Sequence, residues 1–349
     1  AKRMIRVPLG SEDPPSLTLE GVKAFLAAAL LHDIGHFPFT HSLKELPLKN
    51  HEKLTAELIL SDPLEGLISR RFGADPRLAA AIVDETADDG GLREVVFFRR
   101  ILSGVLDPDK LDYLNRDAYY CGVPYGVQDT DFVIGRIHPH PERGLALDLA
   151  GLPAVENILF SKYLMYRAVY WHKTVRIATA MIKKAVFLAL KEGAIRPEEL
   201  YGLDDEDFFR VVAAREFAPF SLVRRVAARD LLKTAVDLPW DGERFRRLED
   251  LELRGEAEAR IAAEASRAAG MPVRPEDVVV DIPERITFEI DLPVLAAGGR
   301  TLEYAEAGSV FSPPVVRGFS RALRTLRVAL PAEAAARIAH PGSFFADLL

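Results

Sequence analysis

The sequence is poor in cysteine and contains no long hydrophobic segment. Its 349 residues include one cysteine, Cys121, which excludes an intrachain disulfide and a zinc site built from several cysteines. A lone cysteine commonly behaves as a small hydrophobic side chain, so we expect Cys121 to be buried. The longest apolar run, Ala24 to Leu31, is far shorter than the roughly 20 residues of a membrane-spanning helix. No signal peptide is recognisable, and the sequence therefore predicts a cytoplasmic protein without a membrane partner.

Several motifs for phosphate and cofactor binding are also missing. The sequence contains neither the G-x-x-x-x-G-K-[ST] P-loop nor the G-x-G-x-x-G dinucleotide motif, and no G-x-S-x-G nucleophile elbow. The formal net charge of −7 gives no indication of nucleic acid binding, because such proteins present large basic surfaces. A local basic pocket for a phosphorylated small molecule is compatible with this charge.

The first 190 residues have the hydrophobic spacing of helices. Glu20 to Leu31 is apolar at almost every position, follows a candidate N-cap at Thr18, and ends before Gly35 and Pro38. Further segments have apolar residues three and four positions apart. These segments are 51–60, 75–84, 109–120, 153–170 and 175–192.

From about residue 196 the pattern changes. Short runs rich in β-branched residues predict strands at 278–282, 285–290 and 326–330, with a turn at 297–299. Two charged stretches, 204–207 and 244–267, are expected to be solvent-exposed helix faces or loops. We therefore predict a mainly α protein, with a helical domain over residues 1–195 and a smaller α+β region over residues 196–349.

Four of the eight histidines lie close together, directly after the apolar helix. They are His32, His36, His41 and His51, and Asp33 adds a carboxylate. Imidazole and carboxylate groups bind divalent metals and transfer protons near neutral pH. The cluster therefore predicts a metal or catalytic site. A separate pair, His138 and His140, lies between prolines, and we expect it to form a loop without a third ligand.

Three blocks of sequence together resemble the HD-domain phosphohydrolases. The blocks are 30–41 followed by Asn50-His-Glu52, then Asp107 to Asp117, and finally Ser161 to Lys173. More narrowly, they resemble the deoxynucleoside triphosphate triphosphohydrolase branch, and the resemblance extends from the start of the chain to about residue 184. It implies that a divalent metal ion (Mn, Mg, Fe, Ni or Zn) assists hydrolysis of a dNTP to deoxynucleoside and triphosphate. Members of that branch commonly form homo-oligomers.

The resemblance implies a role for each matching residue. The metal ligands would be His32, Asp33 and Asp109. The catalytic groups that handle phosphate and protons would be His36, His41 and His51, with Glu52 as an orienting partner of one of them, and His41 is our first choice as general acid. The phosphate, sugar ring and 3′-hydroxyl of a nucleotide substrate would contact Lys110, Tyr113 and Asp117, respectively. A stripe of cations and phenols at helical offsets of 0, 4, 8 and 11 would be formed by Lys162, Tyr166, Tyr170 and Lys173.

Two departures from the family pattern leave other functions open. No histidine precedes His32, although the family has a metal-binding histidine in an upstream helix, and we expect that helix before Ala1. Lys44 stands where relatives commonly have an aspartate that supports a histidine, and Glu45 could replace it. The alternative hypotheses are hydrolysis of another phosphoester, such as a nucleoside monophosphate, and a degenerate module that senses nucleotides. The helix around Asp109 and the tyrosine stripe could also be ordinary salt-bridged and packed helix faces.

Overall fold

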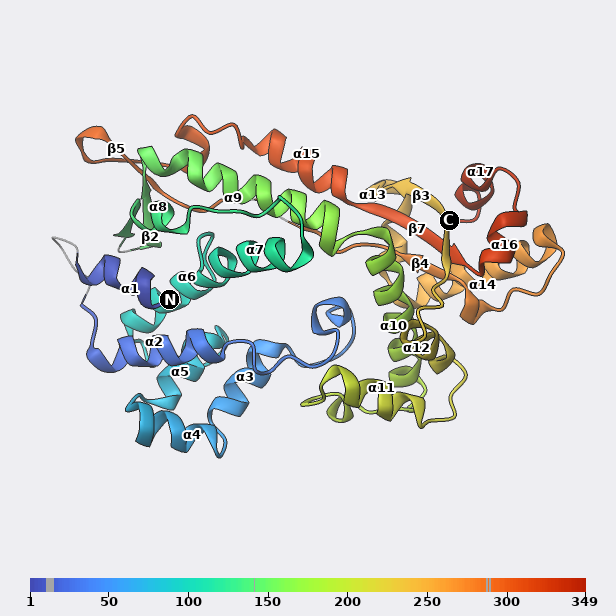
Figure 1. The fold of residues 1–349 in the computed structure, drawn as a ribbon, viewed down its shortest axis with the longest axis horizontal. Coiled ribbons are helices and arrows are strands. Elements are labelled where there is room, and N and C mark those ends of the chain that lie inside the picture. The colour runs from blue at the N-terminus through green and yellow to red at the C-terminus, as the bar shows by residue number, and fades with distance from the viewer. Residues whose placement is uncertain (11–15, 141, 287, 289) are drawn as a thin grey trace. The chain divides into compact units, whose positions relative to one another are not determined.

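The structure is a computed structural model that describes residues 1–10, 16–140, 142–286, 288 and 290–349. Helices dominate it and two small sheets accompany them, which confirms the predicted mainly α fold (Figure 1). The chain forms two compact units, each assembled from three stretches. The first unit comprises Ala1–His36, Lys49–Met165 and Phe288–Val316, and the second comprises Phe37–Leu48, Tyr166–Thr287 and Arg317–Leu349. The predicted boundary at residue 195 falls inside the second unit.

Helices make up most of the first unit. They are α1 (Lys2–Leu9), α2 (Leu19–Leu31), α3 (His51–Ile59), α4 (Leu64–Gly66), α5 (Pro76–Val83), α6 (Arg93–Leu102), α7 (Pro108–Cys121), α8 (Thr130–Ile134) and α9 (Leu152–Met165). The predicted N-cap of α2 is confirmed, because the Thr18 hydroxyl accepts a hydrogen bond from the Gly21 amide at 2.8 Å. Phe25 of α2 stacks on Phe98 of α6, with ring centroids 5.0 Å apart. This buried pair fixes α2 in the core.

A four-stranded sheet completes the first unit, and sequence analysis missed it. Its order is β1 (Ile137–His140), β2 (Gly144–Asp148), β5 (Val294–Ala296) and β6 (Arg300–Leu302), with β2 and β5 parallel and the other pairs antiparallel. The loop expected around His138 and His140 is therefore strand β1. Because β1 is an edge strand, Pro139 can occupy it without breaking a central ladder. His138 lies 3.8 Å from the Asp148 carboxylate.

The second unit combines helices with a three-stranded antiparallel sheet. Its helices are α10 (Lys173–Lys191), α11 (Asp205–Ala213), α12 (Phe220–Ala227), α13 (Gly242–Phe245), α14 (Leu251–Ala269), α16 (Ala332–Arg337) and α17 (Pro341–Ala346), and α15 (Pro313–Leu323) enters it from the first unit. Strand β7 (Thr325–Leu330) lies between β3 (Lys233–Pro239) and β4 (Val279–Asp281). Ile261 of α14 packs with Val280 and Val328 of the sheet in one buried core.

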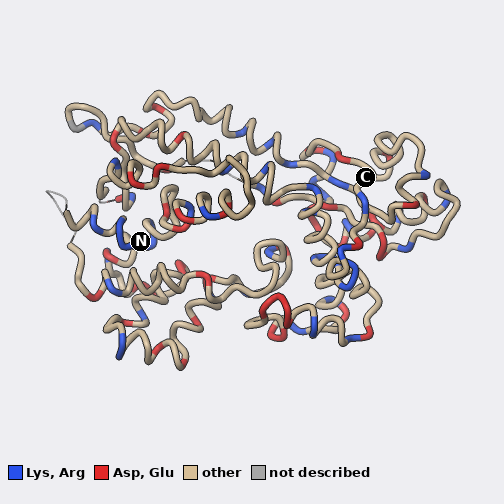
Figure 2. Tube along the Cα trace, viewed as in Figure 1, with Lys and Arg blue, Asp and Glu red and all other residues tan. Residues whose placement is uncertain are grey.

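Charged residues of both signs are distributed over each unit (Figure 2). Among the residues that the structure describes, no helix is both long enough and apolar enough to cross a membrane.

Several details of the sequence analysis need correction. The strands predicted at 278–282 and 326–330 are confirmed by β4 and β7, but the described residues of 285–290 form no strand, and residues 287 and 289 lie outside the described part. The charged segment 244–267 is largely helix α14, yet Arg254 and Glu258 are only 6% and 5% exposed. Cys121, expected to be buried, is exposed at the end of α7. The spacing of charges could not show that α14 packs against other elements on more than one side.

A buried ion pair ties the sheet of the second unit to α10. Asp281, at the end of β4, is 1% exposed. Arg176 of α10 donates two hydrogen bonds to it, one at 3.1 Å and one at 2.5 Å, and Arg327 of β7 lies 3.6 Å away. Such bidentate pairing compensates for the loss of hydration of both charges.

We predict that Asp281→Ala strongly destabilises the second unit, because Arg176 would remain buried without its counter-charge and Arg327 would keep only the exposed Asp237. Removing one partner of a buried pair costs about 3 to 5 kcal/mol, and urea denaturation should show this loss in the free energy of unfolding. The control is Asp237→Ala, since that exposed carboxylate also pairs with Arg327, at 2.9 Å. Asp237→Ala should lower the free energy of unfolding by less than about 1 kcal/mol. Equal losses in the two variants would contradict the prediction.

Candidate metal centre

A tight turn after α2 positions the predicted His-Asp pair. Residues 32–36 fold back against α3, and Thr55 of α3 joins the two segments. The Thr55 hydroxyl accepts a hydrogen bond from the Gly35 amide at 2.9 Å and donates one to the His32 carbonyl at 2.8 Å. A side chain would not fit at Gly35, because a Cβ atom there would lie 2.4 Å from both the His51 carbonyl oxygen and the Thr55 amide nitrogen. The glycine therefore sets the distance between this turn and α3.

The side chains of His32, Asp33 and Asp109 bring metal-ligand atoms together in the first unit. One ligand atom from each residue lies within 4.8 Å of the other two. Nε2 of His32 is 3.4 Å from the Asp33 carboxylate and 3.8 Å from that of Asp109. The other ring nitrogen, Nδ1, is 3.2 Å from the Ala29 carbonyl oxygen. A carbonyl can only accept, so this contact favours a proton on Nδ1, and Nε2 is the nitrogen that faces the two carboxylates and could bind a metal ion.

Asp109 reaches this group from the first turn of α7. The helix begins there because the Asp107 side chain accepts a hydrogen bond from the Lys110 amide at 2.6 Å and Pro108 occupies the first helical position. Burial raises the pKa of Asp109, His32 opposes this shift, and the carboxylates of Asp107 and Asp33 add to it. This accumulation of partly buried carboxylates favours a bound cation.

His36 and His51 form a second group around Asp33, again with ligand atoms within 4.8 Å of one another. Their imidazole rings are stacked, with centroids 4.2 Å apart and planes at 11°. The Asp33 carboxylate is 3.5 Å from Nδ1 of His36 and 3.9 Å from Nε2 of His51. The Glu52 carboxylate is 3.2 Å from Nδ1 of His51. Asp33 is thus common to both groups.

Two lysine ammonium groups lie beside Asp107 in the first unit. Lys110 pairs with Asp107 and donates a hydrogen bond to the Gly104 carbonyl at 2.9 Å. Lys162 of α9 is half-buried, with Nζ 5.3 Å from the centroid of the Phe288 ring. Burial, assisted by repulsion from Lys110, lowers the pKa of Lys162 to about 8, against the attraction of Asp107. Among the described residues, Lys162 has no carboxylate within 4 Å.

The other predicted residues of α7 lie farther along the helix. Tyr113 and Asp117 are half-buried. Exposed Asp112 and Arg116 pair with each other one turn apart. The alternative of a salt-bridged helix face therefore describes these two residues and not Asp109. The contacts of Tyr113 and Asp117 with a nucleotide stay predictions.

Four predicted residues belong to the second unit. They are His41, Tyr166, Tyr170 and Lys173. His41 is exposed on the 3₁₀ turn Thr40–Leu43. The rings of Tyr166 and Tyr170 meet edge to face at 5.1 Å, and burial raises the pKa of Tyr166. The roles of all four residues stay predictions.

The predicted stripe assumed one continuous α-helix, and this assumption was wrong. Tyr166–Tyr170 is π-helical, and Lys173 begins the separate helix α10. The offsets of 0, 4, 8 and 11 therefore do not define one helix face.

Glu45 was considered as a partner that supports His41. Its two carboxylate oxygens are instead 3.1 Å from Lys183 and 3.2 Å from Arg254. Both cations are buried, so Glu45 neutralises charge inside the second unit.

Sequence reasoning missed two residues that shape the centre, Thr55 and Asp107. Thr55 is an ordinary helical residue twenty positions after Gly35, and nothing local signals its two hydrogen bonds. Asp107 directly precedes a proline at the start of a helix, which is a recognisable N-cap pattern. Its pairing with Lys110 follows from the three-residue spacing.

Two protein-family models match the chain. The HD associated region matches residues 129–312, which is more than half of the chain. The HD domain matches residues 17–84, a range that includes His32, Asp33, His36 and His51. The chain is therefore a member of the HD superfamily.

Curated relatives of the chain include two uncharacterized proteins. The uncharacterized protein YwfO of Bacillus subtilis is 35% identical over 165 residues, covering 47% of this chain and 36% of that protein. An uncharacterized protein of Methanocaldococcus jannaschii is 32% identical over 212 residues, covering 60% of this chain and 43% of that protein. The chain thus spans less than half the length of these curated relatives.

Solved structures share the fold. A phosphohydrolase from Bacteroides thetaiotaomicron has a TM-score of 0.69 at 20% identity, covering 94% of this chain and 84% of that one. A hypothetical protein from Aquifex aeolicus has a TM-score of 0.65 at 23% identity, covering 96% and 83%.

We predict that Gly35→Ala lowers both stability and metal affinity, because the added methyl would push the turn away from His51 and Thr55. Overpacking of this kind costs about 1 to 3 kcal/mol. Thermal denaturation measures the stability, and equilibrium dialysis with Mn²⁺ measures the affinity. The control is Gly318→Ala, where an added Cβ atom meets nothing within 4 Å. Unchanged Mn²⁺ affinity in the Gly35 variant would argue against a role of this turn.

Proposed function

We propose that this chain is a metal-dependent phosphohydrolase that acts on nucleotides, and that it converts dNTPs to deoxynucleoside and triphosphate. The observation that supports this most strongly is the convergence of His32, Asp33 and Asp109, from two distant helices, to within 4.8 Å. The HD domain covers the His-Asp turn, and a phosphohydrolase has the same fold. The narrower choice of dNTPs rests on the resemblance of the three sequence blocks to that branch.

The three donors fit a divalent metal ion. One imidazole nitrogen and two carboxylate oxygens suit Mn²⁺, Fe²⁺, Ni²⁺ or Zn²⁺, and the oxygens also suit Mg²⁺. A site with three protein ligands leaves positions for water and substrate. When bound, such an ion supplies Lewis acidity toward a phosphoryl oxygen and lowers the pKa of a bound water.

His36, His51 and Glu52 are placed to hold and move a proton beside Asp33. Glu52 lies next to Nδ1 of His51 and favours a proton on that nitrogen. The stacked rings of His36 and His51 lie 4.2 Å apart. An imidazolium at this place can donate a proton to a leaving oxygen, and a neutral imidazole can accept one from water.

Lys162 supplies a positive charge for which the described residues provide no ion-pair partner. Its ammonium group is half-buried and, among the described residues, has no carboxylate within 4 Å. A cation removed from water needs a counter-charge, and a phosphate group of the substrate would provide it. Lys110, in contrast, is already paired with Asp107.

The test is to separate the products formed from each dNTP in the presence of Mn²⁺. We expect deoxynucleoside and triphosphate from the unmodified chain. Asp109→Ala should lose bound metal, measured by elemental analysis, and lose roughly 100-fold in activity, because one metal ligand is gone. The control is Asp112→Ala on the same helix. The exposed Asp112 carboxylate pairs only with Arg116 among the described residues, so this variant should keep both its bound metal and its activity.

Other outcomes would replace the proposal. Monophosphate and pyrophosphate as products would contradict triphosphohydrolysis. Cleavage of nucleoside monophosphates alone would favour the alternative hypothesis, in which the substrate is a phosphoester other than a dNTP. Metal-free protein that binds dNTPs without cleaving them would favour a nucleotide-sensing module.

We also predict that nucleotide affinity falls as the pH rises through about 8. Lys162 is charged below its pKa of about 8 and neutral above it, so its attraction for phosphate is present at pH 7 and lost by pH 9. KM should rise about tenfold over this range, which corresponds to one charge-assisted hydrogen bond.

Variants of Lys162 test this assignment. Lys162→Met should have a high KM that no longer depends on this titration, and Lys162→Arg should keep a low KM at pH 9. Lys53→Met, on the exposed face of α3, serves as control. Its KM should show the same pH dependence as that of the unmodified chain. A pH dependence that persists in Lys162→Met would assign it to another group.

A further inference from the structure

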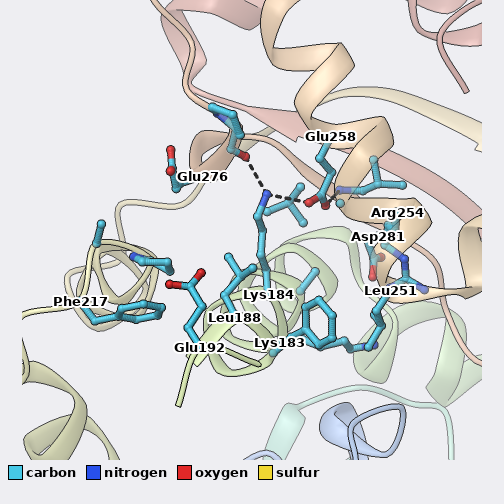
Figure 3. A pocket seen from close by; sticks show the side chains of 18 residues that line it. Lys183, Lys184, Leu188, Glu192, Phe217, Leu251, Arg254, Glu258, Glu276 and Asp281 are labelled. Carbon is cyan, nitrogen blue, oxygen red and sulfur yellow. Dashed lines mark hydrogen bonds and ion pairs between the residues drawn. The ribbon is translucent and has the colours of Figure 1, made fainter. Parts of the chain in front are cut away.

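A cavity of about 450 Å³ lies within the second unit. Its walls are α10, α14, the segment 217–219 before α12, and the segment 275–281 that includes β4 (Figure 3). This volume lies in the range of small-molecule sites. Apolar side chains contribute much of the lining, including Phe187, Leu188, Phe217 and Leu251. None of the residues assigned to phosphate hydrolysis lines it.

The lysine and glutamate at one wall of the cavity neutralise each other. Lys184 donates to the Glu258 carboxylate at 2.6 Å and to the carbonyl oxygens of Pro275 and Val278 at 2.7 Å each, which uses all three ammonium hydrogens. The second Glu258 oxygen accepts a hydrogen bond from the Val280 amide at 2.8 Å. Neither charge is available to a ligand.

The remaining buried charges of the wall are also paired. Lys183 and Arg254 share the Glu45 carboxylate, at 3.1 and 3.2 Å. Asp281 accepts two hydrogen bonds from Arg176. Among the described lining residues, an anionic ligand therefore meets no cation that the protein has left unpaired.

Two carboxylates on the cavity lining differ from these. Figure 3 shows Glu192 and Glu276 on the same side as Phe217, while the hydrogen bonds of Lys184 and Glu258 lie elsewhere. Glu192 is exposed, whereas Glu276 is half-buried and attracted by Arg274. Within the described part of the chain, neither carboxylate has a cation within 4 Å or a side-chain hydrogen bond. Glu192 is also the C-cap of α10, where the helix end adds partial negative charge. A cation is thus favoured here, and an aromatic ring nearby can add to the attraction.

Gly255 lines the cavity on the side of α14. It lies inside a 19-residue helix, where glycine is the least favourable residue apart from proline. The residue is exposed, and a Cβ atom at this position would meet no atom within 4 Å. A larger side chain can therefore be introduced beside the cavity without a clash at its Cβ atom.

We propose that this cavity binds a small amphipathic organic cation, an amine on an apolar or aromatic body. The ammonium group would lie between Glu192, Glu276 and the Phe217 ring, and the body would fill the apolar space beside Gly255. The lining selects against anions because its cations are already paired. This binding is independent of phosphate hydrolysis.

The first test compares three probes of similar size by isothermal titration calorimetry on the full chain. The probes are phenethylamine, 2-phenylethanol and 3-phenylpropionate, which are cationic, neutral and anionic at pH 7. We expect saturable binding of phenethylamine and at least tenfold weaker binding of the other two. Equal or tighter binding of 3-phenylpropionate, or no binding of phenethylamine, would overturn the proposal.

Two variants locate the site. The double variant Glu192→Gln with Glu276→Gln should bind phenethylamine at least tenfold more weakly, whereas Glu206→Gln, in the first turn of α11 and outside the lining, should not. Gly255→Leu should block the cavity while keeping Tm at or above that of the unmodified chain. Full affinity in the double variant would overturn the proposal even if the Gly255 variant failed to fold.

Discussion

The candidate centre depends on one close approach, between the turn at residues 32–36 and the backbone of α3. At Gly35 the two segments leave no room for a Cβ atom, and the Thr55 hydroxyl bonds to the amide of that glycine and to the His32 carbonyl. This contact brings His36 against His51, with the Asp33 carboxylate close to these two rings and to His32. The distances among the imidazole and carboxylate groups follow from it. The electrostatic features of the centre therefore originate in a backbone constraint.

Much of this could be predicted from the sequence because the information is local. The His-Asp turn, the N-cap at Thr18 and the helix from Pro108 each depend on residues a few positions apart, and hydrophobic spacing locates α2, α3 and α10. The meeting of Asp109 with His32 is a long-range contact. No spacing rule predicts it, and only the resemblance to a family indicated it.

The errors have a common physical origin, since they concern features decided by distant partners. Strands β5 and β6 have three residues each and become strands by pairing with β2 and with each other. Helix α14 has a charged sequence, yet Arg254 and Glu258 are buried because Glu45 and Lys184 neutralise them. The helix changes from α to π at Tyr166. The side chains that regular α-helical spacing would place on one face therefore do not form a continuous stripe. In each case the local pattern was read correctly and the tertiary environment changed its meaning.

Compensation of charge separates structural from functional groups in this protein. In the second unit, buried cations such as Arg176 and Lys184 are satisfied by carboxylates and carbonyl oxygens of the chain itself, so their role is to hold elements together. Lys162 in the first unit loses hydration without gaining an ion pair among the described residues, and its lowered pKa records that cost. Exposed Glu192 and half-buried Glu276 border a cavity in the second unit, and neither has a cation within 4 Å among the described residues. Groups that the fold leaves unpaired are those that a ligand can complete, which is why we propose an anion for the first unit and a cation for the second.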